Sequence, residues 1–230
     1  MPIAMAQPAA ERSSTRERVR ATAFRLFGRF GYDGVSMLAV ARGSGVTKAA
    51  LYWHYENKAD LYAACMRQLV GLFEERVFEA AAAEPDPVER IFALFAGLQQ
   101  LVDDERVVDG VAGYWLRPAS ADVSAARAVQ AEFEAGASAA IEAVLEEARA
   151  ADALQIEGSA EDFARAFIAI MEAIVLPMGN RGAPEHRRVV AVLARTFFQA
   201  HARTPGLAER AARVLGAPAT APAEPSEDHS

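Results

Sequence analysis

Apolar residues recur along most of the chain at the three- and four-residue spacing of amphipathic helices. The first such stretch runs from Thr15 to Phe30, and Gly31 follows as a natural end to the helix. Its apolar face consists of Val19, Ala23, Leu26, Phe27 and Phe30. Five arginines lie on the other side of this predicted helix. The pattern therefore opens with one long helix that has a basic outer face.

Two shorter helices are predicted next. Ser36 can cap a helix from Met37 to Gly43, and Gly45 and Thr47 can supply the turn and the cap of a third one. The predicted inward residues of the middle helix are Leu38, Val40 and Ala41. Together with the first helix, these elements account for residues 15 to about 55.

The rest of the chain also reads as helix, interrupted by proline and glycine. Asp86 is the predicted cap of the second of these later helices. The predicted ranges are 57 to about 83, 87–104, 107–116, 120–151, 159 to about 178 or 180, and 184 to about 203. The last residues, rich in Pro, Ala, Glu and Ser, are typical of disorder, as are the first dozen. The fold class is therefore all-α, with about nine helices.

The most informative segment is Gly45 to Lys58. It has a polar turn, a helix of seven or eight residues, and an Asn-Lys pair that begins a longer helix. Such a short helix is not stable alone, so its neighbours must hold it. It combines small side chains with Thr, Lys, Tyr and His, which can reach bases and phosphates. These properties are typical of the second helix of a helix-turn-helix that enters the major groove of DNA.

These residues resemble the DNA-binding domain of the tetracycline-repressor (TetR) family of bacterial transcription regulators. The matching positions are Ala23-x-x-Leu26-Phe27, Gly31-Tyr32, Ser36-Met37, Ala41, Gly45-Val46-Thr47-Lys48, Leu51-Tyr52-Trp53-His54 and Lys58-x-x-Leu61. The resemblance covers about fifty residues. It implies a homodimeric, all-helical regulator without a cofactor, whose larger second domain binds a small molecule. We expect a flexible arm at 1–13, a DNA-binding domain at 14–56, a ligand-binding and dimerisation domain at 57–205, and a largely disordered tail at 206–230.

We expect the DNA contacts to come from the second and third helices and from the start of the fourth. The residues are Ser36, Thr47, Lys48, Ala49, Ala50, Tyr52, His54 and Lys58. Lys58 and Ser36 stand at helix starts, where backbone N–H groups favour a phosphate. Leu51 takes the inward position, which leaves Tyr52 for DNA, whereas Trp53 is expected to pack. For His54, a phosphate contact and a packing or capping role remain equal alternatives.

Charge is distributed unevenly, and this changes how the overall acidity is interpreted. The whole chain has a net charge of −7, yet residues 1–65 hold nine Arg or Lys against five Asp or Glu. That part is therefore +4 and the remainder −11. A basic head on an acidic body directs DNA to one end of the molecule.

Two other classes of function fit the sequence less well. An enzyme needs a convergent site, and the sequence has no nucleophile elbow, phosphate loop, dinucleotide fingerprint or metal-ligand spacing among its four His. A helical homodimeric scaffold without DNA binding would leave the basic head unexplained. The single cysteine, Cys65, lies on an apolar face and indicates a core residue in a reducing compartment. Without a signal peptide or a long apolar run, we expect a cytoplasmic protein with no membrane partner.

The remaining expectations concern the second domain. An apolar effector site is predicted from aromatic and apolar residues on several helices, with Tyr114 and Trp115 as the strongest candidates. The full set is Phe92, Phe95, Gln99, Val111, Tyr114, Trp115, Phe133 and Met171. The expected ligand is hydrophobic or amphipathic, and its binding would release a repressor from a palindromic operator. Ordinary core packing is the alternative for each of these residues.

The last two long helices carry apolar stripes that predict a dimer interface. Its residues are Phe163, Phe167, Ile174, Val189, Leu193 and Phe197. The family resemblance implies a four-helix bundle across a two-fold axis, formed by these two helices of each protomer. The alternative is that both stripes belong to the core of a single chain.

Overall fold

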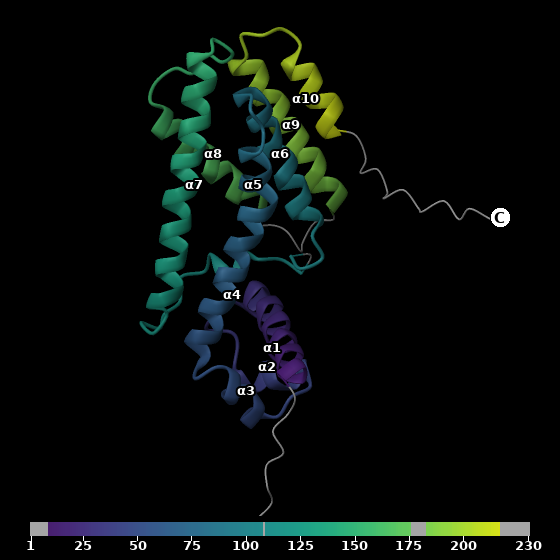
Figure 1. Ribbon diagram of the computed structural model, residues 1–230, viewed down its shortest axis with the longest axis vertical. Coiled ribbons are helices and arrows are strands. Elements are labelled where there is room, and N and C mark those ends of the chain that lie inside the picture. Colours follow the sequence, from purple (N-terminus) through teal and green to yellow (C-terminus); the bar gives the residue numbers. More distant parts are fainter. Residues whose placement is uncertain (1–8, 108, 176–182, 217–230) are drawn as a thin grey trace, which may run out of the picture.

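Helices make up nearly all of the regular structure between residues 9 and 216. The computed structural model describes residues 9–107, 109–175 and 183–216. Within these ranges the only β-type pairing is an isolated bridge between Leu154 and Ala202. The predicted all-α class is confirmed. Figure 1 shows a small head, formed by α1, α2 and α3, at one end of a larger helical body.

The head consists of α1 (Ala9–Phe30), α2 (Met37–Ser44) and α3 (Lys48–His54). The predicted caps are observed. The Ser36 hydroxyl accepts a hydrogen bond from the Ala39 N–H, and the Thr47 hydroxyl accepts one from the Ala50 N–H, both at 3.1 Å. Gly45 ends α2 in a left-handed conformation with φ of +68°, which a residue without Cβ adopts at little cost. The turn between α2 and α3 is therefore fixed by local sequence.

Two predicted core positions of the head were wrong. Phe30 and Leu38 are about half exposed, whereas Phe24 and Met37 are buried instead. In an eight-residue helix the inward row follows Met37, Val40 and Ala41, and Leu38 stands a hundred degrees away from it. Phe30 is the last residue of α1, and the Arg29 guanidinium lies 5.2 Å from its ring centre.

The helix that joins head and body is continuous, as predicted for residues 57 to 83. It comprises α4 (Lys58–Phe73), a π-helical turn η1 (Glu74–Phe78) and α5 (Glu79–Ala82). Asn57 caps its start by accepting a hydrogen bond from the Asp60 N–H at 2.9 Å. Figure 1 shows this rod rising from the head into the middle of the body. The chain passes from the head to the body through this rod.

The helices of the body are α6 (Pro87–Asp103), α7 (Ser124–Ala150), α8 (Ala160–Val175), α9 (Ala183–His201) and α10 (Leu207–Gly216). Of these, α6 and α7 pack against this rod, and the remaining helices pack on α6, on α7 or on one another. The predicted cap of α6 is confirmed, because the Asp86 carboxylate accepts from the N–H groups of Val88 and Glu89. The predicted end of α8, near 178 or 180, lies outside the described residues.

The predicted helix over 107–116 was wrong. This segment is a loop with one 3₁₀ turn, η2 (Ala112–Tyr114), and Gly110 has φ of +92°. The physical reason is close packing against α1. A Cβ at Gly113 would overlap the carbonyl oxygen of Phe27, and one at Gly28 would overlap the carbonyl oxygen of Gly110. The glycines allow two backbones to touch, so apolar content alone gave a false helix.

The chain ends differ from the expectation at both sides. α1 begins at Ala9, within the segment predicted as a flexible arm, and residues 1–8 lie outside the described ranges. α10 lies inside the predicted disordered tail, of which residues 217–230 are not described. It buries Ala208, Ala211 and Leu215. Packing against α9 and α6 thus orders a segment whose sequence is too short to form a stable helix alone.

Candidate nucleic-acid interface and effector cavity

The third helix presents most of its side chains to solvent. Leu51 is fully buried and holds α3 against the rest of the head, while Lys48, Ala49, Tyr52 and Trp53 are exposed. The Lys48 ammonium lies 5.7 Å from the centre of the Tyr52 ring, so the two side chains stand together on one outward face. A capped helix with a cation, a phenol and small residues outward has the shape and donors for a major groove.

Trp53 is the residue of α3 that sequence reasoning misplaced. It was expected to pack, but 66% of its surface is exposed. Its ring meets the His54 ring edge to face, with centres 4.9 Å apart. In a seven-residue helix with a single buried anchor, the two residues after Leu51 both face outward. A large exposed aromatic beside Tyr52 thus enlarges the candidate DNA surface.

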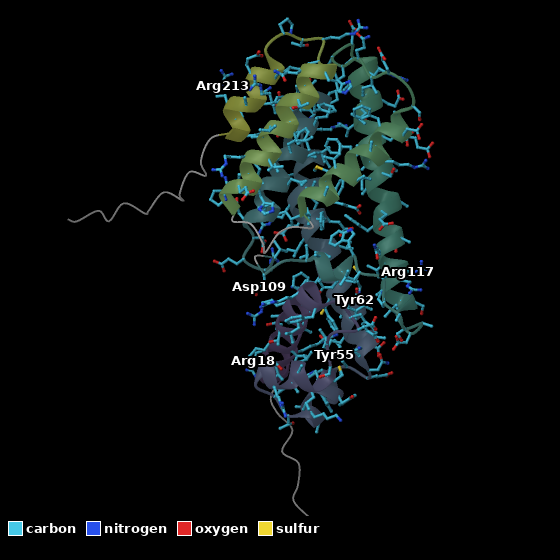
Figure 2. All side chains as sticks on the ribbon, turned by 180° about the vertical axis from the view of Figure 1, so that it is seen from behind. Arg18, Tyr55, Tyr62, Asp109, Arg117 and Arg213 are labelled. Atoms are coloured by element: carbon cyan, nitrogen blue, oxygen red, sulfur yellow. The ribbon has the colours of Figure 1, made fainter. Side chains whose placement is uncertain are left out.

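His54 is half-buried at the end of α3. Burial, and then the nearby positive charge of Arg16, lower its pKa below the usual value of 6.5. The Arg16 guanidinium itself lies 5.7 Å from the ring centre of Tyr55, which is buried in the head (Figure 2). The imidazole is therefore mostly neutral near pH 7.

Lys58 and Ser36 have partners within the head. The Lys58 ammonium donates to the carbonyl oxygens of Tyr32 at 3.1 Å and Val35 at 3.2 Å, and it lies 4.0 Å from the Tyr32 ring centre. Lys58 thereby ties the start of α4 to the loop between α1 and α2. Ser36 is exposed and caps α2. Both side chains lie at helix starts, as the sequence indicated, but Lys58 has a structural task as well.

Aromatic side chains connect the head to the body. The Tyr62 ring stacks on Tyr114 with centres 5.6 Å apart and meets Phe27 edge to face at 5.0 Å. The Tyr114 hydroxyl donates to the carbonyl oxygen of Phe24 in α1 at 3.0 Å. Figure 2 shows Tyr62 at the level where head and body meet. Burial raises the pKa of Tyr62 to about 12 and that of the nearby Cys65 thiol to about 12, so neither ionises near neutral pH.

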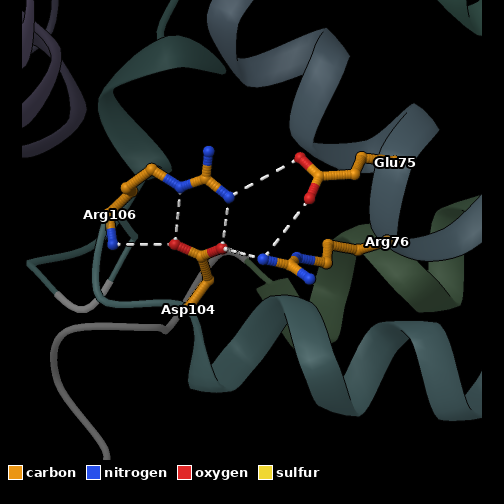
Figure 3. A network of polar contacts seen from close by, with 4 residues as sticks. All are labelled: Glu75, Arg76, Asp104 and Arg106. Carbon is orange, nitrogen blue, oxygen red and sulfur yellow. Dashed lines mark hydrogen bonds and ion pairs between the residues drawn. The ribbon is translucent and has the colours of Figure 1, made fainter.

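A charged network connects η1 with the residues that follow α6. Figure 3 shows Asp104, at the end of α6, between Arg106 and Arg76, with Glu75 on the far side of both arginines. The Asp104 carboxylate accepts from Arg106 at 2.6 and 2.8 Å and from Arg76 at 3.3 Å. These bonds, above all those from Arg106, lower the pKa of Asp104 to about 2. The network joins the π-helical turn η1 to the loop that contacts α1.

The body contains an apolar cavity between α4, α6, α7 and α8. Its cavity volume is about 50 Å³, and a smaller hollow of about 30 Å³ adjoins it. Three predicted effector residues line the larger space, namely Trp115, Phe133 and Met171, and Tyr114 lines the smaller one. A mostly apolar hollow with a few polar groups is typical of a small-molecule site.

The other four predicted effector residues do not line this cavity. Phe92 stacks on Phe198 and carries the Arg210 guanidinium on its ring, while Phe95 is fully buried against Phe167. Gln99 donates to the carbonyl oxygens of Arg187 and Leu215, so it holds the end of α10. Val111 is buried in the core. These side chains point to the α9 and α10 side of α6 or into the core, which helix periodicity could not distinguish.

Sequence reasoning missed most of the residues that line the cavity. Among them are Phe73, Phe78, Glu134 and Glu172. The signal for Glu172 was present, because it is the one acidic residue inside the apolar run of α8 that follows Arg165. Its carboxylate accepts a hydrogen bond from the Trp115 indole N–H at 3.1 Å. The cavity is therefore less purely apolar than the sequence suggested.

The predicted dimer residues differ in their exposure. Phe167 and Phe197 are buried in the core of the chain, and Phe163 and Leu193 are half-buried, whereas Val189 is exposed. The side chain of Ile174 lies outside the described residues. Two further apolar residues of α8 and α9, Ile170 and Val192, are exposed to 43% and 64%. These helices thus expose some large apolar side chains among charged ones, and most of these apolar residues differ from the predicted ones.

Other kinds of site are not seen in the described part of the chain. No group of three or more His, Cys, Asp or Glu side chains there could hold a metal ion. None of its helices combines the length and apolar character needed to cross a lipid bilayer.

Comparison with known proteins identifies the head. A family described as bacterial regulatory proteins, tetR family, matches residues 19–65. A curated relative, the HTH-type transcriptional regulator AcrR of Shigella flexneri, is 38% identical over 98 residues, which are 42% of this chain and 46% of that protein. The chain spans about half the length of the curated relatives it matches.

Solved structures extend the likeness to the whole fold. AibR in complex with isovaleryl coenzyme A and operator DNA has a TM-score of 0.63 at 22% identity, covering 80% of this chain and 98% of AibR. The SmeT–triclosan complex has a TM-score of 0.66 at 20% identity, covering 84% of this chain and 94% of SmeT. At such identities the likeness shows that head and body share the arrangement of these regulators.

Proposed function

We propose that this protein, whose N-terminal domain belongs to the tetR family of bacterial regulatory proteins, is a ligand-responsive DNA-binding transcriptional regulator. The observation that carries the proposal is α3, a capped helix with one buried anchor and an outward face of donors and small side chains. In this proposal residues 14–56 bind DNA, residues 57–205 bind effector and partner protomer, and the protein is a cytoplasmic repressor without enzymatic activity. A scaffold without DNA binding would leave this exposed helix without a purpose.

The proposed DNA contacts divide into base contacts and phosphate contacts. Lys48, Tyr52, Ala49 and Ala50 face bases, and Thr47, Ser36, His54 and Lys58 face phosphates. A dimer would place two α3 helices in successive major grooves of a near-palindromic operator, about 34 Å apart. Lys58 contributes one of its three N–H donors at most, because two already bind carbonyl oxygens of the head.

The test is binding to genomic fragments selected by the full-length protein, followed by fluorescence anisotropy on the best fragment. Lys48→Ala should weaken binding by about 1–3 kcal/mol and relax the preference at one base pair. Arg213→Ala is the matched control, because it removes one positive charge from the exposed face of α10, in the body (Figure 2). Equal affinity for Lys48→Ala and wild type, with Arg213→Ala also unchanged, would refute the role of α3.

The proposed dimer uses the outward face of α8 and α9. Val192, Val189 and Ile170 are exposed there, and apolar surface of this kind favours association. Val192→Glu should convert dimers to monomers in analytical ultracentrifugation at micromolar concentration, with loss of operator binding. Val214→Glu, at another exposed valine on α10, should stay dimeric. A monomeric wild type would contradict this part of the proposal.

The proposed effector is a hydrophobic or amphipathic small molecule held in the cavity between α4, α7 and α8. Two adjacent residues connect the cavity with the head. Trp115 lines the cavity, and the Tyr114 hydroxyl donates a hydrogen bond to the backbone of α1. A ligand shifts the equilibrium between two conformations of the protein only if it binds one of them more tightly than the other. Trp115→Ala should abolish effector binding, as measured by thermal shift.

A further inference from the structure

The two adjoining hollows share one wall, and that wall combines aromatic rings with carboxylates. The residues common to both are Phe73, Trp115, Phe133, Glu134 and Glu172. The ring of Phe73 lies 5.5 Å from that of Phe133 and 6.3 Å from that of Trp115, centre to centre. The wall therefore offers π faces and negative charge at one place.

The carboxylates on this wall have only neutral partners. Glu172 accepts from the Trp115 indole, and Glu134 accepts from the Gln130 amide at 2.8 Å. Within the described ranges, neither forms an ion pair with Lys, Arg or His. A third hollow is lined by Glu134, Glu172 and the basic residue Arg165. The Arg165 guanidinium is paired with Glu161 and Asp162. A ligand in the cavity could therefore supply the cationic partner that the described residues do not give to either carboxylate.

The aromatic rings are likewise without a cation. Elsewhere in the described residues, guanidinium or ammonium groups lie over the rings of Phe30, Tyr32, Tyr52, Tyr55 and Phe92. None lies over Phe73, Phe78, Trp115 or Phe133. An organic cation in this cavity would gain both cation–π attraction and a charge-assisted contact with Glu172.

We propose that the effector is a singly charged organic cation with a flat aromatic body, recognised by Glu172 together with the rings of Phe73, Trp115 and Phe133. Glu134, which is exposed and lines both hollows, attracts the cation from solvent. The inference rests on the proposed function, because it names the ligand class of the proposed effector cavity. An anionic ligand would meet two carboxylates there and is disfavoured.

The ligand position also explains how binding in the cavity changes the contacts of the head. Glu172 holds the Trp115 indole, and the next residue back, Tyr114, donates to the Phe24 carbonyl oxygen in α1. A cation that draws the Glu172 carboxylate to itself weakens the hold on Trp115. The loop that packs against Gly28 and Gly31 is then free to shift relative to α1.

The test compares three probes with the same three-ring size and different charge. N-methylacridinium is a permanent cation, acridine is neutral at pH 7.5, and anthracene-9-carboxylate is an anion. Binding to the full-length protein is measured by probe fluorescence and by calorimetry. The cation should bind at least about tenfold more tightly than acridine, and the anion should bind more weakly than both.

The variant Glu172→Gln keeps the shape and an oxygen that can accept from Trp115, and it removes the charge. It should reduce the preference for N-methylacridinium over acridine by about tenfold and leave acridine affinity within twofold. Glu209→Gln, at an exposed carboxylate on α10, is the control with the same change of charge and should bind all three probes as wild type does.

The possible results separate this inference from the proposed function. A preference for the cation that survives in Glu172→Gln, or equal binding of cation and neutral probe by wild type, would overturn the inference while the effector cavity stands. Tighter binding of the anion would do the same. If no probe binds, the inference falls as well, and operator binding measured with Lys48→Ala then decides separately on the DNA-binding role.

Discussion

The head and the body present opposite chemistry to their partners. The candidate DNA surface of α3 is exposed and supplied with a cation and hydroxyl donors, whereas the body cavity is lined by aliphatic side chains, aromatic rings and two carboxylates. The first suits a polyanion and the second suits a lipophilic cation. The net charge of −7 describes neither site, because each site depends on a few local groups.

The junction is where the two chemistries must be coupled, and it yields the largest expected effect. Gly113→Ala would place a methyl group on the backbone of Phe27 and Gly31, forcing the loop away from α1. We expect a loss of about 3 kcal/mol in unfolding free energy, together with weaker operator binding. Chemical denaturation monitored by circular dichroism measures the first quantity.

Gly136→Ala is the matched control for this substitution. Gly136 lies in the interior of α7, where an added methyl group meets nothing within 4 Å. Since alanine favours helix over glycine, this variant should gain about 0.5–1 kcal/mol. Equal stability changes for the two variants would show that the head and body do not meet through Gly113.

The network in Figure 3 gives the next effect and a defined dependence on pH. The pKa of Asp104 is lowered to about 2 by its arginine partners, so its contribution is present above the unfolded value of about 4 and is lost as the pH falls from about 4 to 2. Asp104→Asn should cost about 2 kcal/mol at pH 7. Its unfolding free energy should then change less than that of wild type over this acidic range. Parallel curves for the two proteins would contradict the assignment.

The smallest effect concerns His54 at the DNA surface. Its pKa is lowered by burial and by Arg16, so the free protein carries a neutral imidazole near pH 7. A phosphate beside it would favour the protonated form, and binding would then take up a proton. Operator affinity should rise by up to about tenfold as the pH falls from 7.5 to 5.5. His54→Asn should flatten this profile, and a steep profile in that variant would assign the proton to another group.

The local structure of the head could be predicted from sequence because its signals are local. Ser36, Gly45, Thr47 and Asn57 form caps and turns with residues within a few positions of themselves. Trp53 could not be assigned in this way, since its exposure depends on how little of a seven-residue helix is covered by neighbours.

The body could be predicted only in outline. Periodicity located the long helices but could not decide which side of α6 faces the cavity, and Phe92 and Gln99 lie on the side that contacts α9. Gly113 looks like part of an apolar helix in sequence, and only the backbone of α1 explains it. Glu172 was overlooked because its partner, Trp115, is 57 positions away.

The central claim, that a cation in the body controls DNA binding by the head, is tested most directly by one titration. Labelled operator is titrated with the full-length protein, with and without saturating N-methylacridinium, and anisotropy gives both dissociation constants. Coupling between sites is reciprocal, so the account predicts at least about fivefold weaker operator binding with the probe and an equal loss of probe affinity on DNA. An operator dissociation constant that stays the same while the probe occupies the cavity would contradict it.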